Sequence, residues 1–209
     1  MNQLRVMCLV FLACITVAAG APARADQAAD GAVRFIESLG TKAIGDLTGD
    51  TLSVAERETR FRALLSEHFD MPAINKFVLG RYWRVATDQE KTEFSRLFEE
   101  FLVKSYAIRF AGYAGQSFEV LGGGESHDGV VIVNSRIDRN GAEPIRLDWR
   151  VIMGASRMTI VDILIEGVSM AVTQRSDFAS VIQSRGGTVA GLLEALRDKA
   201  GGGEQSVAQ

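Results

Sequence analysis

The chain has 209 residues, 47% of them hydrophobic and 23% charged, with a net charge of −3 at pH 7. This balance argues against nucleic-acid binding and against adhesion to an anionic membrane surface, because both favour clustered Lys and Arg. Any function at a membrane is therefore expected to proceed through protein partners.

The first 25 residues have the pattern of a secretory signal peptide. Arg5 precedes an apolar block from Val6 to Ala19, and the small residues that follow end in Ala23-Arg-Ala25, an A-x-A cleavage site. The block is shorter than the about 20 apolar residues that span a bilayer. Cleavage after Ala25 would release a soluble exported chain that begins at Asp26 and has a net charge near −5, since two of the 23 basic residues are removed while all 26 acidic ones stay.

Both cysteines, Cys8 and Cys14, lie in the segment predicted to be removed. The mature chain then has no disulfide and depends on its hydrophobic core. A lipoprotein with a lipidated Cys14 is the alternative, but the apolar block continues past Cys14, so cleavage there would leave part of it on the mature chain. Residues 26–200 are expected to form a single domain, followed by a flexible tail at 201–209.

The first part of the mature chain has helical periodicity. Apolar residues recur at helical spacing from Ala29 to Leu47, and Ser53 with Glu56 forms a capping box for the next helix. Asp70 with Pro72 starts a short helix that ends at Gly80. A second capping box, Thr87 to Glu90, opens the longest helix, which has an unusually large aromatic surface. The predicted helices cover residues 29–47, 54–69, 74–79 and 88–111.

From residue 118 the period changes to alternation, which predicts strands. Three glycines after Leu121 are expected to end the first strand, and Asn140-Gly141 predicts a tight hairpin between the second and third. Short turns between consecutive strands predict an antiparallel meander. Helices before and after it make the fold α+β, a four-stranded antiparallel sheet packed against several helices. The later elements are strands at 118–121, 129–138, 145–153 and 158–166 and helices at 176–185 and 188–199.

No nucleotide-binding loop, zinc spacing or calcium loop is present, and no metal or cofactor is predicted. Glycines 122–124 are not followed by GK[ST] and open no helix, so they are interpreted as a turn. His68 and His127 lack metal-site spacing and are expected at the surface.

Ser169, in the stretch DILIEGVSM, is a poor candidate nucleophile. A hydrolase elbow needs G-x-S-x-G between a parallel strand and a helix, whereas the sequence here is G-V-S-M-A after an antiparallel strand. Asp162 and Glu166 are about 13 Å apart along one strand, too far for a shared-proton pair. One of them could serve as the general base of a small isomerase. The favoured interpretation is that both carboxylates bind backbone donors or arginines, so no catalytic residue is predicted.

Six arginines could offer bidentate donors to a phosphate, although most are expected to pair with Asp and Glu on the surface. They are Arg81, Arg84, Arg109, Arg136, Arg146 and Arg150.

Three separated blocks resemble one known family. They are DILIEGVSM with the following segment to Thr188, residues 77–107 (FVLGRYWRVATDQEKTEFSRLFEEFLVKSYA), and Pro144 to Trp149. In order and spacing they resemble the MlaC-type periplasmic phospholipid carriers, also described as toluene-tolerance auxiliary proteins. The resemblance implies a periplasmic shuttle between an outer-membrane lipoprotein complex and an inner-membrane ABC transporter, with an apolar cavity for acyl chains. A related branch accompanies hopanoid synthesis, so a hopanoid is an alternative cargo.

A lipid carrier needs a deep pocket. Two acyl chains of roughly 15 methylenes each would cost about 24 kcal/mol to expose to water, at about 0.8 kcal/mol per methylene. The lining is expected on the longest helix and on the third and fourth strands, with about half of the candidates serving as ordinary core. The candidates are Phe98, Leu102, Tyr106, Leu147, Trp149, Val151, Ile163, Ile165, Val168 and Met170.

Overall fold

The computed structural model describes residues 21–49, 51–112, 115–125, 129–139, 141–154 and 157–201. Most of the predicted signal peptide, His127, Asn140 and residues 202–209 lie outside these ranges. Within them, no helix is both long enough and apolar enough to cross a membrane.

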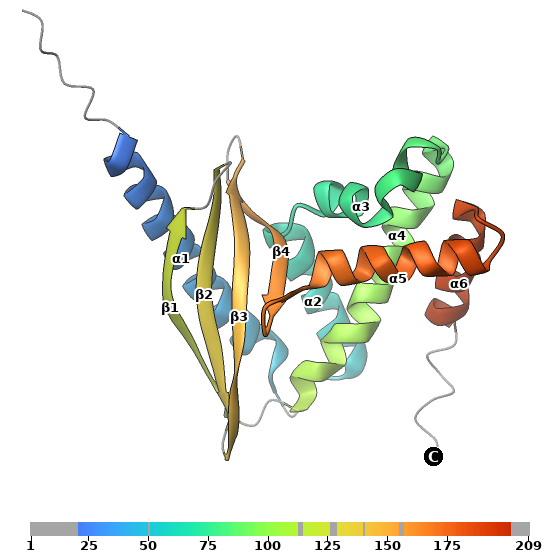
Figure 1. Ribbon diagram of the computed structural model, residues 1–209. Coiled ribbons are helices and arrows are strands. Elements are labelled where there is room, and N and C mark those ends of the chain that lie inside the picture. Colours follow the sequence, from blue (N-terminus) through green and yellow to red (C-terminus); the bar gives the residue numbers. More distant parts are fainter. Residues whose placement is uncertain are drawn as a thin grey trace, which may run out of the picture.

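Helix α1 (Ala21–Leu47) crosses one face of an antiparallel sheet, and the other helices gather beside the edge of the sheet at β4 (Met158–Ile165) (Figure 1). The helices are α1 (Ala21–Leu47), α2 (Val54–His68), α3 (Met71–Leu79), α4 (Asp88–Tyr106), α5 (Met170–Ser184) and α6 (Val189–Gly201), with 3₁₀ helices η1 (Gly80–Arg84) and η2 (Ala107–Gly112). The strands are β1 (Ser117–Glu125), β2 (Val130–Arg139), β3 (Ala142–Met153), β4 (Met158–Ile165) and β5 (Val168–Ser169).

The strands pair in chain order, β1-β2-β3-β4-β5, and every pair is antiparallel. The predicted α+β meander is confirmed, but the described sheet has five strands instead of four. The fifth is only two residues long, too short to produce an alternating pattern.

Capping residues begin the helices where the sequence indicates. Ser53 Oγ accepts a hydrogen bond from Glu56 N at 3.2 Å, while the Glu56 carboxylate accepts one from Ser53 N at 3.0 Å. Thr87 and Glu90 form the same reciprocal pair at the start of α4. The longest predicted helix, 88–111, is divided, because the α-helix ends at Tyr106 and continues as the 3₁₀ helix η2.

Several predicted boundaries are wrong. Helices α1 and α3 and strand β3 begin earlier than expected, at Ala21, Met71 and Ala142.

Two further differences are larger in effect. The strand expected at 118–121 runs on to Glu125, so the three glycines lie within β1, where the pairing register shifts between Val120 and Gly122. The helix expected from Ser176 begins six residues earlier, at Met170. Glycines in β1 and the polar residues Thr173 to Arg175 in α5 interrupt the apolar pattern, so the pattern did not show that the strand and the helix continue there.

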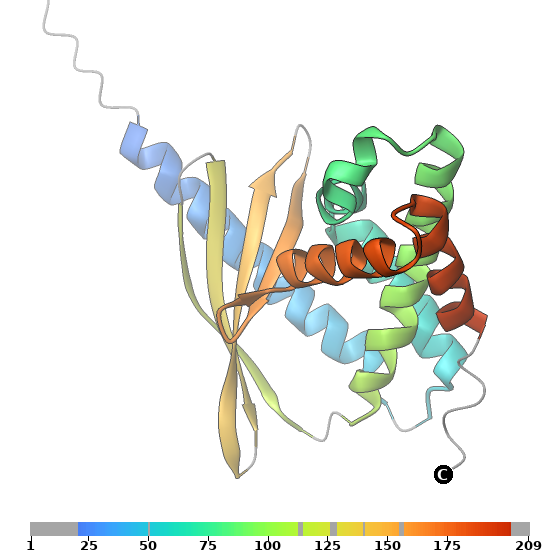
Figure 2. The ribbon, with the colours of Figure 1, turned by 45° about the vertical axis from the view of Figure 1, so that its right-hand side comes forward.

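Helix α1 crosses one face of the sheet and approaches it closely (Figures 1 and 2). A Cβ atom placed on Gly40 would lie 2.4 Å from the Phe118 ring of β1. On the same helix, Ala32 and Ile36 are fully buried and pack with Val133 and Ile160 of the sheet. Gly40 therefore allows the helix and the sheet to touch.

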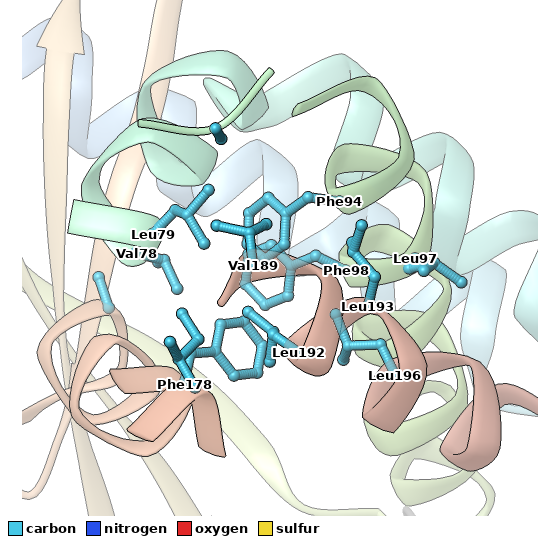
Figure 3. Packing of buried hydrophobic residues seen from close by; sticks show 13 residues of the cluster. Val78, Leu79, Phe94, Leu97, Phe98, Phe178, Val189, Leu192, Leu193 and Leu196 are labelled. Carbon is cyan, nitrogen blue, oxygen red and sulfur yellow. The ribbon is translucent and has the colours of Figure 1, made fainter. Parts of the chain in front are cut away.

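The core is divided into two clusters. The sheet cluster joins α1 and α2 to strands β2, β3 and β4. The helical cluster joins α3, α4, α5 and α6, and Figure 3 shows Phe98 and Phe178 facing each other at its centre. The two parts are connected at the α2–α3 junction, where Asp70 N donates to Ile160 O of β4 at 2.9 Å.

Candidate functional site

The stretch DILIEGVSM connects the sheet to the C-terminal helices through a complete reversal of the chain. Glu166 and Gly167 both have positive φ, 50° and 78°, as a two-residue type I′ hairpin turn requires. Leu164 then pairs with Ser169, and Ile165 with Val168. The simple bend expected at Gly167 is thus a hairpin, with α5 starting directly after it.

Asp162 is the polar centre of this junction. Only 8% exposed, it accepts hydrogen bonds from Ser169 Oγ at 2.6 Å and from Ala171 N at 3.0 Å. Ser169 Oγ in turn accepts from Val172 N at 3.1 Å and caps α5. Both the hydroxyl and the carboxylate therefore hold the start of α5, and Ser169 is a helix-capping residue.

Glu166 has a comparable structural task. Its Oε1 accepts a hydrogen bond from Arg146 N of β3 at 2.5 Å, and its own N–H donates to Arg146 O at 3.0 Å. At this turn the main chain leaves β3, so the Glu166 side-chain oxygen accepts the hydrogen bond from Arg146 N that a main-chain carbonyl of β4 would otherwise accept. This contact explains a glutamate at a positive φ, a conformation that otherwise costs about 1–2 kcal/mol.

The six arginines that could bind a phosphate have different surroundings. Arg136 contacts Glu119 at 2.7 Å and Asp138 at 3.2 Å, and Arg150 lies 4.0 Å from Asp162. Arg81 and Arg109 lie over the rings of the neighbouring Tyr82 and Tyr106. Arg84 and Arg146 have no carboxylate of the described residues within 4.0 Å.

His68 is not at the surface, contrary to the expectation. Its side chain is 20% exposed, its ring meets Phe35 edge-on at 5.7 Å, and Nε2 is buried without a hydrogen-bond partner among the described residues. Burial lowers the pKa of His68, with Glu67 opposing the shift. Phe35 of α1, which is distant in sequence, covers the His68 ring. The position of His68 near the end of α2 therefore could not predict that its ring is covered.

Five of the predicted pocket residues lie on one face of the sheet. Directly paired residues of antiparallel strands point to the same side. Leu147 pairs with Ile165, and Trp149 with Ile163, while Val151 pairs with Ile160 after a register shift. This face is the one that α1 partly covers, and Trp149 and Ile163 remain half-buried there.

The candidates on α4 lead from one core cluster toward the other. Phe98, 2% exposed, and Leu102 belong to the helical cluster, whereas Phe110 of η2 packs with the sheet cluster. Tyr106 follows at the same four-residue spacing and belongs to neither cluster. Leu147 and Ile165 of the sheet also belong to neither.

The remaining two candidates lie at the hairpin. Val168 is 55% exposed, and Met170 is half-buried at the first residue of α5.

A hydrogen bond that the sequence did not predict orients the Trp149 ring: its Nε1 donates to the buried Ser135 Oγ at 2.8 Å. The position of Ser135 among the alternating inward residues of β2 is the signal that could have indicated it.

Comparison with sequence models of known protein families matches residues 38–198 to the family described as MlaC protein. The match covers well over half of the chain.

The chain belongs to the MlaC family. A solved structure is also similar, a phospholipid-binding protein from Ralstonia solanacearum in complex with a phospholipid. The TM-score is 0.74 at 23% sequence identity, over 84% of this chain and 98% of that one. At this identity the similarity establishes a shared fold. The family membership predicted from the three sequence blocks is confirmed.

Proposed function

We propose that this MlaC-family chain is a periplasmic lipid carrier that holds phospholipid acyl chains in an apolar pocket. It would move lipid between an outer-membrane lipoprotein complex and an inner-membrane ABC transporter, as its family resemblance implies, without a catalytic step. The fold shared with a protein that was solved with a phospholipid supports the choice of ligand.

The observation that carries the proposal is the incompletely covered apolar face of the sheet. Trp149, Ile163 and Ile165 are apolar and half-buried on that face, although a sheet face packed only as core would be fully covered. The core is divided into two clusters, one on this face of the sheet and one among α3, α4, α5 and α6, and Tyr106 of α4 belongs to neither. An acyl chain would complete the burial of these side chains.

The proposed lining follows from this arrangement. Leu102 and Tyr106 of α4 face the acyl chains from the helical side, and four residues line the sheet side, with Val168 and Met170 closing one end. Phe98 and Val151 are 2% and 1% exposed within their clusters and form the base beneath the lining. The sheet residues are Leu147, Trp149, Ile163 and Ile165.

Native mass spectrometry tests the proposal on the mature chain purified gently from a membrane-containing host. We expect a bound mass of one lipid per chain, and extraction followed by fragmentation distinguishes a phospholipid from a hopanoid. Recovery of the apo mass alone would contradict the carrier function.

Charged substitutions test the pocket itself. Trp149→Asp or Leu102→Asp is expected to abolish lipid retention, because an acyl chain cannot offset the desolvation of a carboxylate. Ile108→Asp is the matched control, since Ile108 is 49% exposed on η2. Full lipid occupancy in a folded Trp149 or Leu102 variant would exclude these residues from the pocket.

A further inference from the structure

A separate surface forms where α3, η1 and α5 meet. Helices α3 and α5 lie side by side, and η1 continues α3 toward α4 (Figures 1 and 2). Four exposed cations and two exposed apolar residues of these helices make up what we call the basic–apolar surface. They are Lys76, Phe77, Arg81, Arg84, Val172 and Arg175.

Arg175 of α5 is held against α3 although it is distant in sequence. Its guanidinium lies 5.3 Å from the centre of the Phe77 ring. It also lies over Gly80, where a Cβ atom would come within 2.8 Å of Arg175 Nε and where φ is +58°. Glycine at position 80 thus permits both the backbone conformation and the contact that brings Arg175 beside Phe77.

Helical spacing aligns further members of the surface. Arg81 and Arg84 are three residues apart in η1, and a 3₁₀ helix has three residues per turn, so both extend from the same side. Arg81 is supported by Tyr82, whose ring centre is 4.9 Å away. Val172 and Arg175 are likewise neighbours along one face of α5.

The four cations are not neutralised by the fold. None has a carboxylate of the described residues within 4.0 Å, whereas Arg62, Arg136 and Arg197 elsewhere all form ion pairs. Two acidic residues are close in sequence: Asp88 pairs with Lys91, and Asp177, two residues after Arg175, points to a different side of α5. Positive charge therefore collects on one part of an acidic chain.

Apolar side chains project among these charges. Phe77 is 42% exposed and Val172 is 53% exposed, and Val85, directly after Arg84, is 75% exposed. The centre of a protein interface is enriched in arginine but depleted of lysine and of other charged residues. Cations interleaved with projecting apolar groups instead match a bilayer surface, where the former meet anionic headgroups and the latter enter the headgroup region.

We propose that the basic–apolar surface docks this protein on the anionic surface of a phospholipid bilayer. Composition and charge predict membrane function only through protein partners, because Arg175 joins the other three cations only in the folded chain. The inference goes beyond the proposed carrier function and does not depend on the cargo.

Vesicle sedimentation of the mature chain tests the proposal. We expect binding to vesicles that contain phosphatidylglycerol, little binding to pure phosphatidylcholine vesicles, and release at high salt as the charges are screened. Arg81→Gln/Arg175→Gln should lower the partition coefficient about 25-fold, since each cation near an anionic surface contributes about five-fold.

Arg34→Gln/Arg60→Gln is the matched control, because it removes the same charge from exposed arginines of α1 and α2. It should bind vesicles like the unmodified chain. Equal losses in the two double variants, or no binding of the unmodified chain to anionic vesicles at low salt, would overturn the proposal. In the latter case an acidic protein would be the better complement to the charges. Native mass spectrometry of the same preparations reports lipid cargo separately, so failure of docking is distinguishable from failure of carriage.

Discussion

At the scale of single residues, side-chain carboxylates replace main-chain partners where the sheet meets the C-terminal helices. Asp162 accepts from Ala171 N, and Glu166 accepts from Arg146 N. An unpaired buried N–H is costly, so acidic residues at these positions have a structural reason that requires no chemistry on a ligand.

Asp162→Ala is expected to lower the free energy of unfolding by about 2–3 kcal/mol, because it leaves Ala171 N–H unsatisfied and releases the Ser169 hydroxyl. Ser169→Ala, which removes only the cap of α5, should cost about 1 kcal/mol. Urea denaturation measures both. Unchanged stability of Asp162→Ala with loss of bound lipid would instead place this carboxylate in ligand binding.

His68 should make stability depend on pH. Burial holds the folded-state pKa of His68 below the unfolded value of about 6.5, so the unfolded chain binds the proton more tightly. Its contribution to stability is complete above pH 6.5 and is lost as the pH falls through the folded pKa. We expect His68→Leu to flatten that decline in urea titrations across pH 7 to 5, whereas parallel curves would contradict it.

The sequence predicted several of these residue roles. Ser53 and Thr87 begin helices because their partners lie three residues ahead, which is a local signal, whereas the helix that Ser169 begins was expected only from Ser176. The burial of His68 depends on Phe35 in another helix, and no local pattern contains that contact.

At the scale of elements, the contact of α1 with the sheet depends on a glycine in the helix. Gly40 would normally weaken a helix interior, yet Phe118 occupies the place of its side chain. Helix periodicity from Ala29 to Leu47 predicted α1 but not which neighbouring positions touch the sheet. The structure shows two neighbours on the packed side, Leu39 buried at 5% exposure and Gly40 against Phe118.

Two alanine substitutions in α1 should therefore have opposite effects. Gly45 has no atom within 4 Å of a Cβ placed on it, so Gly45→Ala should stabilise the protein by about 1 kcal/mol through helix propensity. Gly40→Ala should destabilise it, because the new Cβ would overlap the Phe118 ring. Thermal unfolding of the two variants measures the contrast, and a similar gain in both would contradict this close packing.

Elements with a long repeat were predictable, and short ones were not. Strand β3 alternates from Ile145 to Val151 and was recognised there, whereas β5 has two residues and no period. The face of the sheet that carries Leu147 and Trp149 followed from that alternation. The partial burial of Trp149 did not, because it depends on how α1 and Phe118 of β1 pack on this face.

At the scale of the whole molecule, the divided core would connect stability to the proposed lipid cargo. Leu147, Ile165 and Tyr106 belong to neither cluster, and the proposed lipid would contact all three. A ligand that binds only the folded state stabilises it by mass action.

Removal of lipid should consequently lower the melting temperature. A lipid at 100 times its Kd would contribute about 2.7 kcal/mol, so delipidated protein should melt several degrees lower and recover when phospholipid is added. Differential scanning calorimetry measures the shift. Identical melting with and without lipid would show that the lipid does not complete the core.

The irregular pairing of β1 affects how the protein behaves at high concentration. This strand is an outer edge of the sheet, and a regular edge offers free N–H and C=O groups to a strand from another molecule. The register shift at Gly122 interrupts that row, and Glu119 adds a charge held by Arg136. A strand from a second molecule could not form a continuous row of hydrogen bonds with β1. The edge therefore resists the strand-to-strand association that leads to aggregates.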